Sequence, residues 1–134
     1  MTEPEILRIK VVIRKTNDGF SACRPEEEKM AGTGKKAAGA LGSFISLYGK
    51  RFLGVETIIP RYKEVFDVNT LSGRKVFLVT DLDGGKHFRA EYYSRCVSVE
   101  TPGLGETADD AIGECVLLLK RGILPLEIVH DYEM

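Results

Sequence analysis

Residues 31–45, AGTGKKAAGALGSFI, combine glycines with two lysines in a way that could bind a phosphate. A Walker loop has the pattern G-x-x-x-x-G-K-[ST], in which backbone N–H groups and the lysine hold the phosphates. Here Lys29 stands where the first glycine is needed, and Lys36 where the serine or threonine is needed. The Walker pattern is therefore absent. Lys35 and Lys36 remain candidates for binding an anion, because the free N–H groups at a helix start attract negative charge.

Other residue patterns that could support catalysis are sparse. The two histidines, His87 and His130, lack the spacing of metal ligands, and no Gly-x-Ser-x-Gly motif is present. Residues 81–85, DLDGG, lack the later ligands of a calcium loop and are typical of a hairpin turn. Cys115 lies on the apolar face of an expected helix, which indicates a core residue. We therefore expect no catalytic residue, metal or cofactor, and a protein that is not an enzyme.

Charge is unevenly distributed along the chain, although the net charge is only −1. Residues 29–75 contain nine basic and three acidic residues, whereas residues 81–114 contain eight acidic and three basic ones. One interpretation of this asymmetry is that one half binds a charged partner. The other is that the two halves complement each other in charge, or that each complements a half of a second subunit. The candidate anion-binding or RNA-binding residues in the basic half are Lys35, Lys36, Lys50 and Arg51.

The bulk composition indicates a globular protein of the cytoplasm. The chain has 134 residues, enough for one compact domain or two very small ones, with 43% hydrophobic and 29% charged residues. No apolar run reaches the length of a membrane span, and the acidic start MTEPEILRIK is unlike a signal peptide. Three cysteines without close spacing predict reduced thiols.

An internal repeat is the strongest pattern in the sequence. Residues 32–58 align with residues 103–129 at a constant offset of 71 positions, without a gap and with eight identities. Average composition would give about two by chance. The repeat predicts a pseudo-two-fold duplication, because two copies are too few for a solenoid. We divide the chain into a first unit (residues 1–60), a connector with one candidate strand (61–74) and a second unit (75–134), within one compact domain.

Each unit is predicted to have the order β-β-β-α-β. Residues 6–15 and 75–81 are rich in β-branched or aromatic residues, and an Asp-Gly turn follows each of them. Apolar residues recur at helical spacing after each Gly-x-Gly. Thr107 and Asp110 resemble a capping box at the second helix start. The fold class is therefore α+β, with the helices packed on antiparallel-rich sheet.

Gly42 and Gly113 occupy equivalent positions in the middle of the two expected helices. Glycine there costs about 1 kcal/mol relative to alanine. We expect close packing against these glycines, either between the helices or between helix and sheet.

Residues 18–22 (DGFSA), the pair Pro25–Glu26 and residues 105–111 (GETADDA) match two short motifs of a known family. On these residues the chain resembles the HicB-like antitoxin family. That family has a D-G-[FY]-x-[AV] hairpin followed by a Pro-acid pair, and a helix start of the form G-x-[ST]-x-x-[DE]-A. The first unit has the hairpin in residues 18–22 and the pair Pro25–Glu26, and the second has the helix start in residues 105–111. The resemblance implies two diverged units in tandem, each a degenerate ribonuclease-H-like fold without nuclease activity.

The resemblance also implies a function, since HicB-like antitoxins mask a small RNA-cleaving toxin. The leading hypothesis is a non-catalytic protein-binding module whose partner is a small basic toxin-like protein or, in a repurposed assembly role, another copy of the chain. A second hypothesis is RNA binding by the basic half, because GTGKKAAGAL also resembles the helix start of double-stranded-RNA-binding domains. A third is an enzyme with a site between the units. No membrane partner is expected.

Overall fold

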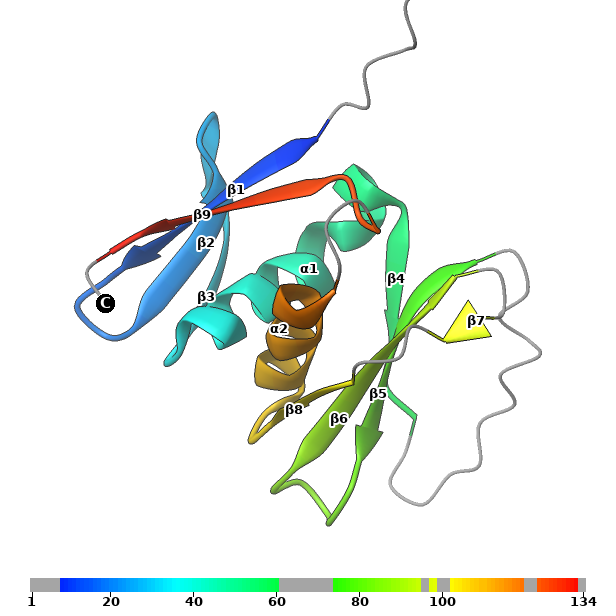
Figure 1. Cartoon of the computed structure of the whole chain (residues 1–134). Helices are drawn as coiled ribbons and strands as arrows, with labels where there is room; N and C mark the ends of the chain where they lie inside the picture. Colours follow the sequence, from blue (N-terminus) through cyan, green and yellow to red (C-terminus); the bar gives the residue numbers. More distant parts are fainter. Residues whose placement is uncertain (1–7, 61–73, 95–96, 99–101, 120–122, 133–134) are drawn as a thin grey trace, which may run out of the picture.

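The computed structural model describes residues 8–60, 74–94, 97–98, 102–119 and 123–132. In these ranges the chain forms an α+β fold of nine strands and two helices (Figure 1). The elements, in chain order, are β1 (Ile9–Lys15), β2 (Phe20–Arg24), β3 (Glu27–Gly34), α1 (Ala37–Leu53), β4 (Val55–Ile58), β5 (Lys75–Asp81), β6 (Phe88–Ser94), β7 (Val97–Ser98), β8 (Gly103–Gly105), α2 (Ala108–Leu118) and β9 (Leu126–Asp131).

The strands form two mixed sheets. Sheet A has the strand order β3-β2-β1-β9, and sheet B has the order β4-β5-β6-β7, with β8 also paired to β6. Within each sheet the hairpin strands are antiparallel, as the Asp-Gly turns between them predict. One parallel pair completes each sheet: β1 with β9 in sheet A, and β4 with β5 in sheet B.

These two parallel pairs exchange strands between the halves of the chain. β4 follows α1 but joins the sheet of the second half, where Val55 pairs with Lys75. β9 follows α2 and joins the sheet of the first half, where Leu126 pairs with Ile9. The sequence analysis placed each closing strand in the unit that it ends, residues 1–60 or 75–134, whereas the structure places each in the sheet of the other half. Each sheet is therefore completed by a strand from the other half of the chain.

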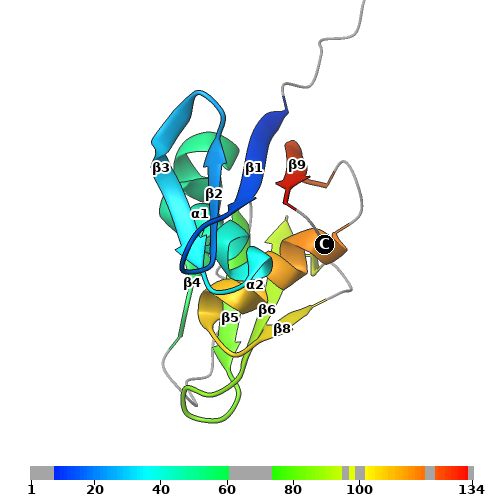
Figure 2. The same cartoon turned by 90° about the vertical axis from the view of Figure 1, so that its left-hand side faces the viewer.

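The two helices lie between the sheets and share one core. α1 packs on sheet A and α2 on sheet B, while the helices also pack on each other (Figures 1 and 2). The buried cluster includes Ile13 from sheet A, Leu41 and Phe44 from α1, Ile112 from α2 and Phe77 from sheet B. The apolar faces expected from helical spacing are therefore those that fill the space between the sheets.

The helices approach most closely at two buried glycines, Gly42 and Gly113. A Cβ atom at Gly42 would collide with the carbonyl oxygen of Asp109, and one at Gly113 with that of Ala38. Both obstacles are backbone atoms of the facing helix. Any side chain at either position would therefore force α1 and α2 apart.

The repeated Gly-x-Gly pattern has a similar packing role at the point where each helix begins. A Cβ atom at Gly32 would lie 2.7 Å from the Cα of Phe44, and one at Gly103 would lie 2.8 Å from the Cα of Cys115. Each glycine therefore lets the strand before the helix pass directly against the helix backbone.

The two halves differ in their third strand, and two expectations lie outside the described residues. The third strand of the second half is divided into β7 and β8, whereas that of the first half is the single strand β3. The candidate strand at residues 64–68 and the thiol of Cys96 lie outside the described residues.

Neither α1 nor α2, the helices of the described part of the chain, is long and apolar enough to cross a membrane.

Candidate functional site

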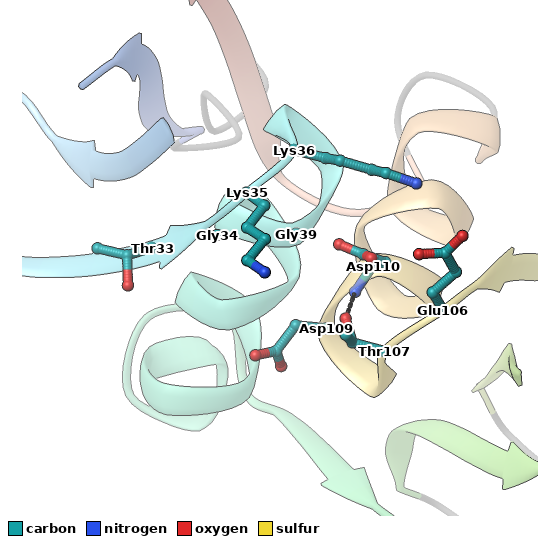
Figure 3. Close-up of a pocket in the computed structure, with 9 residues that line it drawn as sticks. All are labelled: Thr33, Gly34, Lys35, Lys36, Gly39, Glu106, Thr107, Asp109 and Asp110. Atoms are coloured by element: carbon teal, nitrogen blue, oxygen red, sulfur yellow. Dashed lines mark hydrogen bonds between the residues drawn. The ribbon is translucent and has the colours of Figure 1, made fainter. Parts of the chain in front are cut away.

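A pocket lies where the two helices begin, at the same end of the molecule. It has a volume of about 430 Å³ and is shown in Figure 3. One wall comes from the end of β3 and the start of α1, and the other from the start of α2. The lining residues are Thr33, Gly34, Lys35, Lys36, Gly39, Glu106, Thr107, Asp109 and Asp110.

The two helix starts that meet here are capped differently. At α2, the Thr107 hydroxyl accepts a hydrogen bond from the backbone N–H of Asp110 at 3.0 Å, which is one half of the predicted capping box. The reciprocal hydrogen bond, from the Thr107 N–H to the Asp110 carboxylate, is not formed, although the structure describes both residues. Asp109 and Asp110 place negative charge at the positive end of this helix. At α1, the cap residue is Lys36, which makes no side-chain hydrogen bond to the helix, and the first turn contains no acid.

Opposite charges face each other across the pocket without pairing. Lys35 and Lys36 lie on the α1 wall, whereas Glu106, Asp109 and Asp110 lie on the α2 wall (Figure 3). No ion pair joins any two of these five side chains, all of which belong to the described residues. Burial, with a further contribution from the neighbouring charge of Asp110, raises the pKa of Asp109. The α2 wall therefore carries more negative charge than its surroundings neutralise.

Asp110 is the most enclosed charged group of the site, with 9% of its surface exposed. A Cβ atom at Gly39 would collide with Oδ1 of Asp110, so the carboxylate occupies space that a side chain at residue 39 would fill. No described residue donates a hydrogen bond to this carboxylate. Its negative charge faces the first turn of α1, where the helix dipole gives some compensation.

Two smaller pockets extend this one into a groove. A pocket of about 330 Å³ shares Lys36 and Glu106 with it and is otherwise lined by Leu82, His87, Phe88, Leu104 and Gly105. A pocket of about 350 Å³ shares Thr33, Gly34 and Lys35 and reaches the β1–β2 hairpin at residues 16–20. The groove thus runs from one Asp-Gly hairpin to the other, past both helix starts.

The side of the groove near the β5–β6 hairpin is apolar and exposed. Leu104 is 61% exposed and Leu82 is 45% exposed. These two leucines add apolar surface beside the charged pocket.

A histidine–carboxylate pair lies within this hairpin. The Asp83 side chain pairs with Nδ1 of His87 and accepts a hydrogen bond from the backbone N–H of Lys86 at 3.1 Å. The hydrogen bond to Asp83 raises the pKa of His87, and the same contact lowers the pKa of Asp83. No group of three or more metal-ligating side chains forms a metal site within the described residues.

The structure separates the four basic residues singled out by sequence. Lys35 and Lys36 line the pocket, whereas Lys50 and Arg51 lie in the last turn of α1, at the opposite end of the helix. The Arg51 guanidinium lies 5.3 Å from the ring centroid of Phe52. The four residues therefore do not form one anion-binding surface.

Asp110, Gly39 and Leu104 are members of the site that sequence reasoning did not single out as binding residues. Asp110 was interpreted as part of a helix cap, and the cap accounts only for its backbone N–H. The sequence did contain one indication, since Gly39 and Asp110 occupy equivalent positions in the two copies of the repeat. The glycine has no side chain, and this leaves room for the carboxylate of Asp110.

Comparisons with known proteins give no relative: no protein-family model, curated protein or solved structure matches the chain significantly. Function must therefore be argued from the geometry of the site.

Proposed function

We propose that the chain is a non-catalytic protein-binding module, formed by tandem duplication of a HicB-like β-β-β-α-β unit. Its partner would be a small basic protein that it neutralises or, in an assembly role, another copy of the chain. The observation that carries this proposal is the groove at the helix starts, which combines exposed leucines with an excess of acidic side chains.

The duplication is supported by equivalent contacts in the two halves. Gly32 meets Phe44 and Gly103 meets Cys115, and both pairs are related by the same offset of 71 residues. The same offset relates the two close contacts between the helices, since it turns Gly42 into Gly113 and Ala38 into Asp109. Gly42 meets Asp109, and Gly113 meets Ala38. Such reciprocity is expected when two copies of one unit pack around a two-fold axis.

Protein is favoured over RNA as the partner because of the charges around the lysines. An RNA-binding helix start needs cations free to contact phosphates. Lys35 and Lys36 instead share their pocket with Glu106, Asp109 and Asp110, which would repel a phosphate backbone. The exposed leucines of the groove suit a polypeptide better than a nucleic-acid backbone.

Affinity capture from native extract tests this proposal. The wild-type chain should retain one protein in stoichiometric amount at high salt, and Leu104→Glu should lose it. Leu47→Glu is the matched control, because Leu47 is 63% exposed on α1 and does not line the groove. Equal capture by both variants would contradict a groove-bound partner, and RNA released by salt would support the alternative RNA-binding role.

A further inference from the structure

Within the groove, the carboxylate of Asp110 has no ion-pair partner among the described residues. The residue is 9% exposed, its carboxylate has no hydrogen-bond donor among the described residues, and it lines the pocket between the helix starts (Figure 3). Its oxygens keep some contact with solvent through the pocket, so a cation that enters the pocket can reach them and pair with them. We propose that this pocket binds the guanidinium group of an arginine side chain of the partner protein, with Asp110 as its counter-ion. This inference rests on the proposed protein-binding function.

The size of the pocket fits an organic cation rather than a water molecule or a metal ion. Its volume of about 430 Å³ falls in the range of about 300–1,000 Å³ typical of ligand pockets. A single water has a share of only about 30 Å³. The acids of the α2 wall do not form a cluster of metal ligands, as none exists within the described residues.

The charge arrangement favours a cation at the base of the pocket. Asp110 is buried and Asp109 half-buried, whereas Lys35 and Lys36 are exposed at the rim. Exposed ammonium groups are hydrated and mobile, so they neutralise a buried carboxylate poorly. A cation that enters between the helix starts would also relieve the repulsion that contributes to the raised pKa of Asp109.

Arginine suits the site better than lysine. Its planar guanidinium can donate two parallel hydrogen bonds to one carboxylate and is less strongly hydrated than an ammonium, so burial costs less. The neighbouring pocket with Phe88 and Leu104 offers apolar surface to the residues beside that arginine. Lys35 and Lys36 would repel further cations, so the site should select an isolated arginine rather than a polybasic stretch.

The test is a titration of the full-length ¹⁵N-labelled protein with N-acetyl-arginine-amide, followed by NMR. N-acetyl-citrulline-amide is the matched ligand, because it has nearly the same shape without the charge. Arginine amide should shift the backbone signals of Gly39, Thr107 and Asp110, and the citrulline compound should not. Equal shifts with both compounds, or none with either, would overturn the proposal.

Variants separate the charge of Asp110 from its position. Asp110→Asn keeps the backbone N–H that caps α2 and should weaken arginine-amide binding about tenfold or more. Glu114→Gln removes the same charge from α2 outside the pocket and should bind as the wild type does. Gly39→Ala keeps the charge but displaces the carboxylate, so it should also weaken binding. Unchanged binding by Asp110→Asn would refute the role of this residue.

Two further results keep the inference separate from the proposed function. If Asp110→Asn fails to fold, Gly39→Ala still tests the role of Asp110, since it keeps every charge of the pocket but displaces this carboxylate. If a partner is captured through Leu104 but arginine amide does not bind, the arginine inference fails and the protein-binding function survives. If arginine amide binds while capture fails, the protein-binding function is the part that fails.

Discussion

The crossing of α1 and α2 gives the sharpest prediction for stability, through the substitution Gly42→Ala. The added Cβ atom would lie 2.7 Å from the carbonyl carbon of Asp109 and 2.9 Å from the backbone nitrogen of Gly113. Carbon–carbon contacts are normally about 3.5–4.0 Å. The tightest contact, with the carbonyl oxygen of Asp109, requires the helices to separate by more than about 1 Å, because backbone atoms cannot move aside by changing rotamer.

The size of the effect follows from two opposing contributions. Overpacking a core typically costs about 1–3 kcal/mol, and a collision between two backbones lies at or above the upper end of that range. Replacing a mid-helix glycine with alanine returns about 1 kcal/mol. We expect Gly42→Ala to lower the free energy of unfolding by about 2–3 kcal/mol.

Gly49→Ala is the matched control in the same helix. Gly49 is buried, but its Cβ atom would lie 3.3 Å from the carbonyl oxygen of Val55 and 3.4 Å from a methyl of Ile45, so small shifts suffice. This variant should be as stable as the wild type or slightly more so, because the gain in helix propensity is the same as at Gly42. The difference between the two variants therefore isolates the helix crossing.

Urea unfolding followed by circular dichroism measures both variants. A loss of 2–3 kcal/mol should lower the midpoint of Gly42→Ala by about 1–2 M. The double variant Gly42→Ala, Gly113→Ala should lose less than the sum of the single losses, because both substitutions open the same gap. Equal midpoints for Gly42→Ala and Gly49→Ala would refute the close-approach argument.

Three further predictions concern the exchanged strands, a buried thiol and a histidine. Two fragments separated between Pro60 and Arg74 should remain unfolded alone and regain circular dichroism when mixed, because each sheet needs a strand from both; a fragment that folds alone would contradict this. Burial raises the pKa of Cys115 to about 11, so alkylation near neutral pH should label it only after unfolding, and labelling of the folded protein would show that the thiol is accessible. Asp83 raises the pKa of His87, so their pairing should stabilise the protein below the ordinary imidazole pKa and cease to do so as pH rises through the raised value. An NMR titration should show a lower His87 pKa in Asp83→Asn, and an unchanged midpoint would show that the pair does not form.

Much of the secondary structure could be predicted because it depends on local chemistry. The turn at Gly19, with its positive φ angle, and the cap at Thr107 are both fixed by residues within a few positions. The exchange of closing strands could not be predicted in this way. β4 and β9 have similar sequences, and nothing local distinguishes pairing within a half from pairing between halves.

The site was only partly predictable for a related reason. Lys35 and Lys36 were singled out by type and position, and they do line a pocket. Their neighbours across the pocket are about seventy residues away in sequence and meet them only because the two helix starts lie together. Lys50 and Arg51 were grouped with them by charge alone, yet a 17-residue helix places the pairs at opposite ends.

The helix crossing and the groove depend on each other, because α1 provides one wall of the groove and α2 the other. Asp110 reaches the first turn of α1 only while the helices are as close as Gly42 and Gly113 allow. Gly42→Ala should therefore widen the pocket and weaken arginine-amide binding even when the variant is fully folded. A ligand that contacts both walls should in turn stabilise the crossing, by an amount that grows with its concentration relative to its dissociation constant. Binding measured on folded Gly42→Ala thus tests whether the glycines that permit close packing also shape the site.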